Sequence, residues 1–61
     1  MPLSRADALL AQAEIDATSD PAGAIPTAEA ALKLYQDAGA ATAAAQARAL
    51  LTELTDAAQS A

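Results

Sequence analysis

The chain has 61 residues, 54% of them hydrophobic, and a formal net charge of −5 from three basic and eight acidic side chains. This length predicts a single small domain over residues 1–61. The acidic balance argues against nucleic acid and anionic membrane surfaces as partners, and no apolar run is long enough to cross a bilayer. The N-terminal residues lack the apolar core of a signal peptide, so we expect a cytoplasmic protein.

Alanine dominates the composition, with 21 positions, and leucine and isoleucine supply ten more apolar side chains. Alanine is the strongest helix former and lets helix backbones approach closely, so the composition predicts an all-α fold. The large aliphatic side chains are few, and a domain of this size buries only about 60% of its unfolded surface. No cysteine is available for a disulfide. We therefore expect a second copy or another protein to complete the core.

The first predicted helix covers about residues 4–18. Ser4, with Asp7 three residues later, resembles a capping box with Asp in place of the usual Glu. The helical repeat places one apolar stripe along this segment and a second apolar side opposite it. The opposite side carries Ala8, Ala11 and Ile15. With two apolar sides, this helix is expected to lie between two neighbours.

The second predicted helix covers about residues 22–38. Asp20 followed by Pro21 is typical of an N-cap and a first helical position. Because Pro26 would remove a hydrogen bond from a helix interior, we expect either a start nearer Gly23, which leaves Pro26 in the first turn, or a tight first turn before Pro26. The apolar stripe of this segment includes Tyr35, whereas Leu34 points away from it.

The third predicted helix covers about residues 40–59, and its first half is almost purely alanine. Gly39 suits the left-handed position that ends the preceding helix. Arg48 lies at the border of the apolar stripe, where we interpret it as a surface side chain whose stem covers apolar neighbours. Short connections predict three helices that run antiparallel in sequence.

Three segments carry a family resemblance: Asp20–Ile25 (DPAGAI), Ala28–Tyr35 (AEAALKLY) and Asp37–Ala40 (DAGA). Within Ala6–Leu54, they resemble tetratricopeptide-repeat (TPR) arrays in large regulatory proteins of high-GC bacteria. The resemblance implies a helical hairpin plus an extra helix, acting in protein–protein interaction. The aromatic and Gly/Tyr markers of the first TPR helix are absent, and a glycine stands where a proline ends the second. A small three-helix bundle remains the alternative fold.

No catalytic, cofactor-binding or metal-binding site is predicted, and we expect no enzyme and no cofactor. The chain has no histidine and no cysteine, which removes the commonest general base, metal ligand and thiol nucleophile. The two glycines are isolated, so no phosphate-binding loop is indicated. We interpret the carboxylates as solvated acidic faces. The carboxylates concerned are those of Asp7, Glu14, Asp16, Glu53 and Asp56.

The candidate interaction surface combines aliphatic residues off the main stripes with the single aromatic side chain. Its members are Ala8, Ala11, Ile15, Leu34 and Tyr35. Tyr35 has an alternative role, as a core residue with its hydroxyl at the rim. Two hypotheses follow. One is a TPR-like module that binds a partner helix, a peptide or its own copies. The other is an assembly element: a homodimeric bundle, a docking domain of a larger multidomain enzyme system, or a designed or excised helical fragment.

Overall fold

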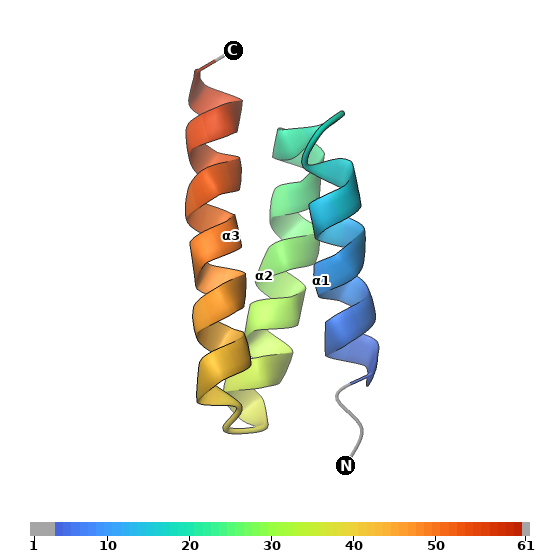
Figure 1. The fold of residues 1–61 in the computed structure, drawn as a ribbon, viewed down its shortest axis with the longest axis vertical. Coiled ribbons are helices and arrows are strands. Elements are labelled where there is room, and N and C mark those ends of the chain that lie inside the picture. The colour runs from blue at the N-terminus through green and yellow to red at the C-terminus, as the bar shows by residue number, and fades with distance from the viewer. Residues whose placement is uncertain (1–3, 61) are drawn as a thin grey trace.

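The computed structural model describes residues 4–60. Three helices follow one another: α1 (Ser4–Asp16), α2 (Pro21–Asp37) and α3 (Ala41–Gln59). Each helix runs antiparallel to the one before it, and α2 lies between the other two (Figure 1). The predicted all-α fold of three antiparallel helices is confirmed, with boundaries that differ by at most two residues from the expected ones.

The first connection ends α1 at Asp16, earlier than expected, because the backbone turns there. The amides of Ser19 and Asp20 both donate to the Asp16 carbonyl, at 3.1 and 2.7 Å. Asp20 then caps α2, since its carboxylate accepts a 3.1 Å hydrogen bond from the Gly23 amide. Pro21 occupies the first turn, where a missing N–H costs nothing. The predicted cap is confirmed.

The predicted start of the second helix near Gly23 is wrong, because α2 already begins at Pro21 and Pro26 lies inside it. The Asp20 cap starts the helix at Pro21, so Pro26 lies inside it. Because Pro26 has no N–H, the carbonyl of Ala22 lacks its helical hydrogen-bond donor. Since Ala22 is exposed, water can hydrate that carbonyl. A Cβ atom at Gly23 would collide with the Asp20 carboxylate, so the glycine permits the cap.

The second connection ends α2 with a Schellman motif. Gly39 has a φ of 73°, in the left-handed region that favours glycine. The Ala40 amide donates to the Tyr35 carbonyl at 2.9 Å, and the Gly39 amide donates to the Gln36 carbonyl at 3.1 Å. These are the two hydrogen bonds that define the motif. They satisfy carbonyls that the helix end would otherwise leave open.

The middle of the bundle is α2, which packs against both other helices, whereas α1 and α3 make few contacts with each other. The expectation that the first helix would lie between two neighbours is therefore wrong, and α2 has that position. Ala24, Ala28 and Ala31 are fully buried along α2. Their small side chains allow α1 and α3 to approach the same central helix.

The core consists of two clusters, one toward each end of the bundle. The Tyr35 cluster contains Ala6, Ala31, Tyr35, Ala44 and Ala47. The Leu54 cluster contains Ala13, Ala24, Ala28 and Leu54. Each cluster thus surrounds one large side chain with alanines. Ala44 is a core residue that the apolar stripe predicted for the third helix omits; the members of that stripe are Ala40, Ala43, Ala47, Leu50, Leu51, Leu54 and Ala58. The helical repeat also predicts Ala38 on the stripe of the second helix, but Ala38 is exposed. Leu3, predicted on the stripe of the first helix, lies outside the described residues.

Candidate interaction surfaces

The bundle leaves most of its large aliphatic side chains in contact with solvent. Tyr35 and Leu54 are the only large side chains that the described residues bury fully. Partial exposure remains for Leu9, Leu10, Ile25, Leu32, Leu34, Leu50 and Leu51. The cause is shape: the Cα positions span 38 × 16 × 13 Å, too thin to enclose more than a central line of side chains. These partly exposed aliphatic side chains are therefore available to pack against another molecule.

The outer face of α1 presents the apolar patch that the sequence indicates. Ala8 and Ala11 are exposed, and Ile15 is 67% exposed. They are spaced by three and four residues, so they lie along one face of the helix. This face points away from α2, because the buried residues of α1 are Ala6 and Ala13 on its other side. Ile15 is the one exposed large hydrophobic residue in the part of the chain that the structure describes.

Leu34 and Tyr35 differ from the other candidates, because both contact the core. Leu34 is half-buried and packs against the Tyr35 cluster, so it does not point fully away from the stripe. Tyr35 is 1% exposed. Its place in the candidate interaction surface is therefore not supported, and its alternative role as a core residue holds.

The Tyr35 hydroxyl donates a hydrogen bond to the carboxylate of Asp7, which joins α2 to α1. This hydrogen bond raises the pKa of Tyr35 from 10.0 to about 12, with burial and the negative charges of Asp7 and Glu14 adding to the effect. The ring is thus buried while the hydroxyl reaches the rim. Asp7 has a structural partner, which the solvated-face interpretation missed. The 28-residue separation of this pair gave no local sequence signal.

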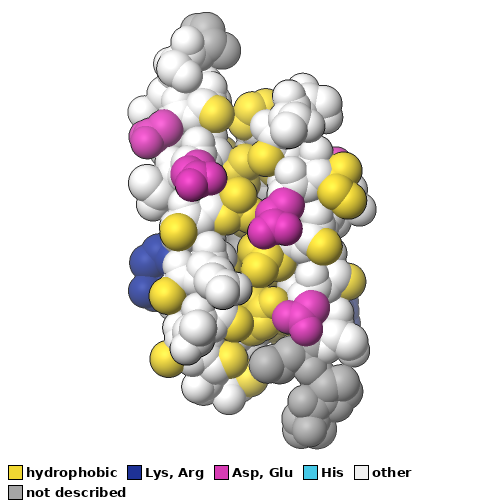
Figure 2. Space-filling view, viewed as in Figure 1, with side chains coloured by type: hydrophobic (Ala, Val, Ile, Leu, Met, Phe, Trp, Pro, Cys, Tyr) yellow, Lys and Arg dark blue, Asp and Glu magenta, His cyan; other side chains and the backbone are white. Residues whose placement is uncertain are grey.

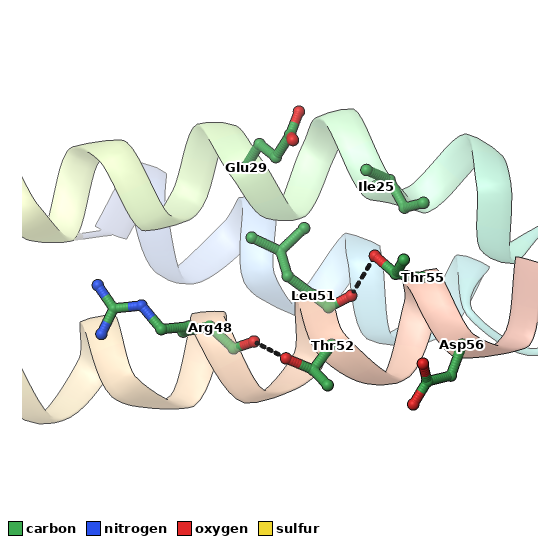
Figure 3. A pocket seen from close by; sticks show the side chains of 7 residues that line it. All are labelled: Ile25, Glu29, Arg48, Leu51, Thr52, Thr55 and Asp56. Atoms are coloured by element: carbon green, nitrogen blue, oxygen red, sulfur yellow. Dashed lines mark hydrogen bonds between the residues drawn. The ribbon is translucent and has the colours of Figure 1, made fainter.

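The seam between α2 and α3 contains two open hollows that the sequence did not indicate. The first, of about 320 Å³, is lined by Ile25, Glu29, Arg48, Leu51, Thr52, Thr55 and Asp56 (Figure 3). The second, of about 300 Å³, is lined by Tyr35, Gln36, Gly39, Ala40, Ala41, Ala44 and Arg48. Arg48 borders both. The position of Arg48 at the edge of the predicted apolar stripe was the one sequence signal that could have pointed to these hollows.

The face between α1 and α3 has a different character. Figure 2 shows hydrophobic side chains along the line where the two helices flank α2, with acidic side chains on both columns beside it. Asp7 and Glu14 belong to this side of α1, because both act on the hydroxyl of Tyr35. Leu10 lies between them in helical spacing and is half-buried. An apolar line with acidic edges therefore runs over the central helix.

The described residues hold no group of three or more metal-ligating side chains. Residues 4–60 also include no helix with the length and apolarity that crossing a membrane requires. The hydroxyls of Thr52 and Thr55, which border the first hollow, donate to the carbonyls of Arg48 and Leu51 at 3.2 and 2.8 Å. These hydroxyl protons are committed to the backbone of their own helix. The first hollow thus combines the apolar Ile25 and Leu51 with the charged residues Glu29, Arg48 and Asp56.

Comparison of the chain with protein-family models, with curated protein sequences and with solved structures gives no match.

Proposed function

We propose that the protein is a non-enzymatic helical interaction module of TPR-like type. It binds a partner helix, a peptide or a second copy of itself through its apolar helical faces, and we place it in the cytoplasm, as the sequence analysis expects. One observation carries the proposal: of the large side chains in residues 4–60, Tyr35 and Leu54 alone are fully buried. Covering the partly exposed aliphatic surface of this thin bundle with another apolar surface lowers the free energy by about 25 cal/mol per Å².

The packing supports the TPR-like part of the proposal. TPR arrays place small residues where neighbouring helices cross, and Ala24, Ala28 and Ala31 are fully buried where α2 meets its neighbours. Two antiparallel helices followed by a third match a repeat pair plus the first helix of the next. Repeat units of this kind bury their apolar faces by stacking on further units. The exposed aliphatic side chains are in keeping with such stacking.

The assembly alternative rests on the outer face of α1. Ala8, Ala11 and Ile15 form an exposed patch without a charged member. A patch of this kind pairs readily with its own copy about a two-fold axis, because both copies present the same surface. Self-association through α1 would make the protein an assembly element rather than a receptor for other chains.

The test is a titration of the isotope-labelled protein with amphipathic helical peptides, followed by amide chemical shifts. The peptides share their aliphatic positions and differ in charge: one set acidic, one basic and one neutral. Saturable shifts at amides beside the half-buried leucines would support the proposal. A folded chain that stays monomeric across the concentration range in sedimentation equilibrium, and whose amides respond to no peptide, would refute it.

Two variants separate the assembly alternative from binding of other chains. Ile15→Gln removes the exposed aliphatic side chain on α1. Ala45→Gln introduces the same amide side chain at an exposed position of α3. If copies pair through α1, Ile15→Gln lowers the weight-average mass at a given concentration and Ala45→Gln leaves it unchanged. Equal effects of the two variants would exclude pairing through the outer face of α1.

A further inference from the structure

We propose that the seam between α2 and α3 binds an amphipathic helix whose carboxylate pairs with Arg48, between two aliphatic side chains that occupy the hollows on either side. The inference rests on the proposed function and specifies its partner and its surface. The three features that carry it are the pair of hollows, the shared cation and the unequal charge along the seam.

The two hollows have similar volumes, about 320 and 300 Å³, and both are open to solvent. Ile25 of α2 and Leu51 of α3 face each other across the first (Figure 3). Alanine and glycine form much of the wall of the second, together with Gln36 and Arg48. Each hollow therefore offers an apolar contact, and each volume exceeds that of one aliphatic side chain.

Arg48 is the one residue common to both hollows, and its side chain is exposed. In Figure 3 the guanidinium extends away from Leu51 and Asp56, along α3 toward the second hollow. A guanidinium offers five N–H donors in a planar fork that suits a carboxylate. It therefore provides a polar contact at the midpoint between the two hollows.

The charges along the seam specify the partner's polarity. Beside the first hollow lie the carboxylates of Glu29 and Asp56, whereas the lining of the second has Arg48 as its charged member. A complementary helix thus carries a basic residue beyond its first aliphatic anchor and an acidic residue between its two anchors. Like charges at either place would oppose binding, which gives the seam selectivity as well as affinity.

The spacing of the hollows sets the spacing of the anchors. Their α3 linings, residues 48–56 and 41–48, are centred about eight residues apart, which is roughly 12 Å at 1.5 Å per residue. In a partner helix, positions i and i+7 lie on one face and are about 10.5 Å apart. An acidic residue at i+3 or i+4 falls between them on that same face. A partner of about three helical turns therefore reaches both hollows and Arg48.

The experiment uses the full chain and a synthetic helix of about four turns with leucine anchors at i and i+7. Its position i+4 carries Glu, Gln or Lys in three otherwise identical peptides, and binding is followed by fluorescence anisotropy and amide shifts. We expect the Glu peptide to bind most tightly and the Lys peptide most weakly. The shifted amides are expected at Ile25, Leu51 and Ala44.

Two variants with the same change in net charge test the role of the cation. Arg48→Glu reverses the charge in the seam, and Arg5→Glu reverses an exposed charge on α1 that lines neither hollow. Arg48→Glu should weaken binding of the Glu peptide roughly fivefold, the scale of an exposed ion pair, and should strengthen binding of the Lys peptide. Arg5→Glu should change both affinities less than about twofold, since screening limits distant surface charges.

The outcomes separate this inference from the proposed function. Equal effects of Arg48→Glu and Arg5→Glu would overturn the inference, as would shifts confined to the outer face of α1 or to the line between α1 and α3. Either result would leave a protein that binds helices, so the proposed function would stand. A monomeric chain that binds none of the peptides would overturn both. Circular dichroism of each variant verifies that the exposed substitutions preserve the helices.

Discussion

The two ends of the bundle solve the same packing problem with different chemistry. At the end closed by the Schellman turn, the Tyr35 cluster surrounds an aromatic ring with alanines and ties its hydroxyl to Asp7. At the other end, the Leu54 cluster surrounds a branched aliphatic side chain and has no side-chain hydrogen bond among its buried members. One end is therefore oriented by a polar contact, whereas the other depends on shape alone.

This difference shows how alanine-rich helices obtain a defined packing. Buried alanines bring the helices close together, but they leave the helices free to rotate and slide, since their surfaces are nearly smooth. A single large side chain per end limits that freedom by filling the space the alanines leave. These two side chains should therefore contribute most to the stability of the bundle. Substitutions there should destabilise it far more than substitutions at the half-buried leucines.

The largest expected effect is that of Tyr35→Ala. Removing a buried aromatic side chain costs about 3–5 kcal/mol. A chain of this length has a free energy of unfolding of roughly 3–9 kcal/mol in total. The variant should therefore lose most of its helical circular dichroism in the absence of denaturant. A urea midpoint close to that of the parent chain would contradict the central role of this ring.

Tyr35→Phe is the matched control for that substitution. It keeps the ring and removes only the hydroxyl that donates to Asp7. The net worth of such a hydrogen bond is about 0.5–1.5 kcal/mol, so the variant should remain helical with a moderately lower urea midpoint. If Phe and Ala were equally damaging, the hydrogen bond rather than the packing of the ring would dominate this end.

Leu54→Ala is expected to have the next largest effect. Leucine-to-alanine substitutions in cores cost about 2–5 kcal/mol, and the cost falls where the surroundings can collapse onto the cavity. Leu54 lies in the last turns of α3, where the helix can move toward Ala24 and Ala28. We therefore expect a value near the lower limit, measured by urea unfolding. A loss greater than that of Tyr35→Ala would reverse the ranking of the two ends.

Gly39→Ala should cost less, about 1–2 kcal/mol, because an L-residue is strained at its φ of 73°. Within residues 4–60, no heavy atom beyond the two flanking residues lies within 4 Å of a Cβ at this position, so the cost is backbone strain without a steric clash. Chemical synthesis supplies the matched control, D-alanine, which favours positive φ. The D-alanine variant should match or exceed the parent in its urea midpoint. A D-alanine variant as unstable as the L-alanine one would mean that the turn depends on something other than φ.

Local sequence signals predicted much of the fold. The Asp20–Pro21 pair marked one helix start, and Gly39 marked one helix end, because caps depend on neighbours a few residues away. The order of the helices in space was harder, since alanine on several sides of each segment leaves the partner of each side undefined. For that reason the sequence suggested that α1 lies between two neighbours, whereas in the structure α2 has that position. Of the candidate surface, Ala8, Ala11 and Ile15 are exposed as the sequence indicated. The hollows beside Arg48 depend on how two helices pack, which no local pattern specifies.

The last expected effect is an alkaline loss of stability specific to the Tyr35 end. The pKa of Tyr35 rises from 10.0 to about 12 in the folded protein, so folding favours the neutral phenol. Its stabilising contribution is complete below pH 10.0 and disappears as the pH rises through about 12. The single tyrosine of the chain makes the tyrosinate absorbance a direct measure of this titration.

Two variants assign the cause of that alkaline transition. Asp7→Asn removes the carboxylate that accepts the Tyr35 hydrogen bond, which is the largest contribution to the raised pKa, so the tyrosinate midpoint should fall toward 10.0. Tyr35→Phe should abolish the part of the stability loss between pH 10.0 and about 12 that the tyrosine contributes. A midpoint near 10.0 in the folded parent chain would mean that Asp7 does not hold the phenol, and the two ends would then depend equally on shape. A raised midpoint that Asp7→Asn lowers would establish that one end of this alanine-rich bundle is oriented by a polar contact between helices.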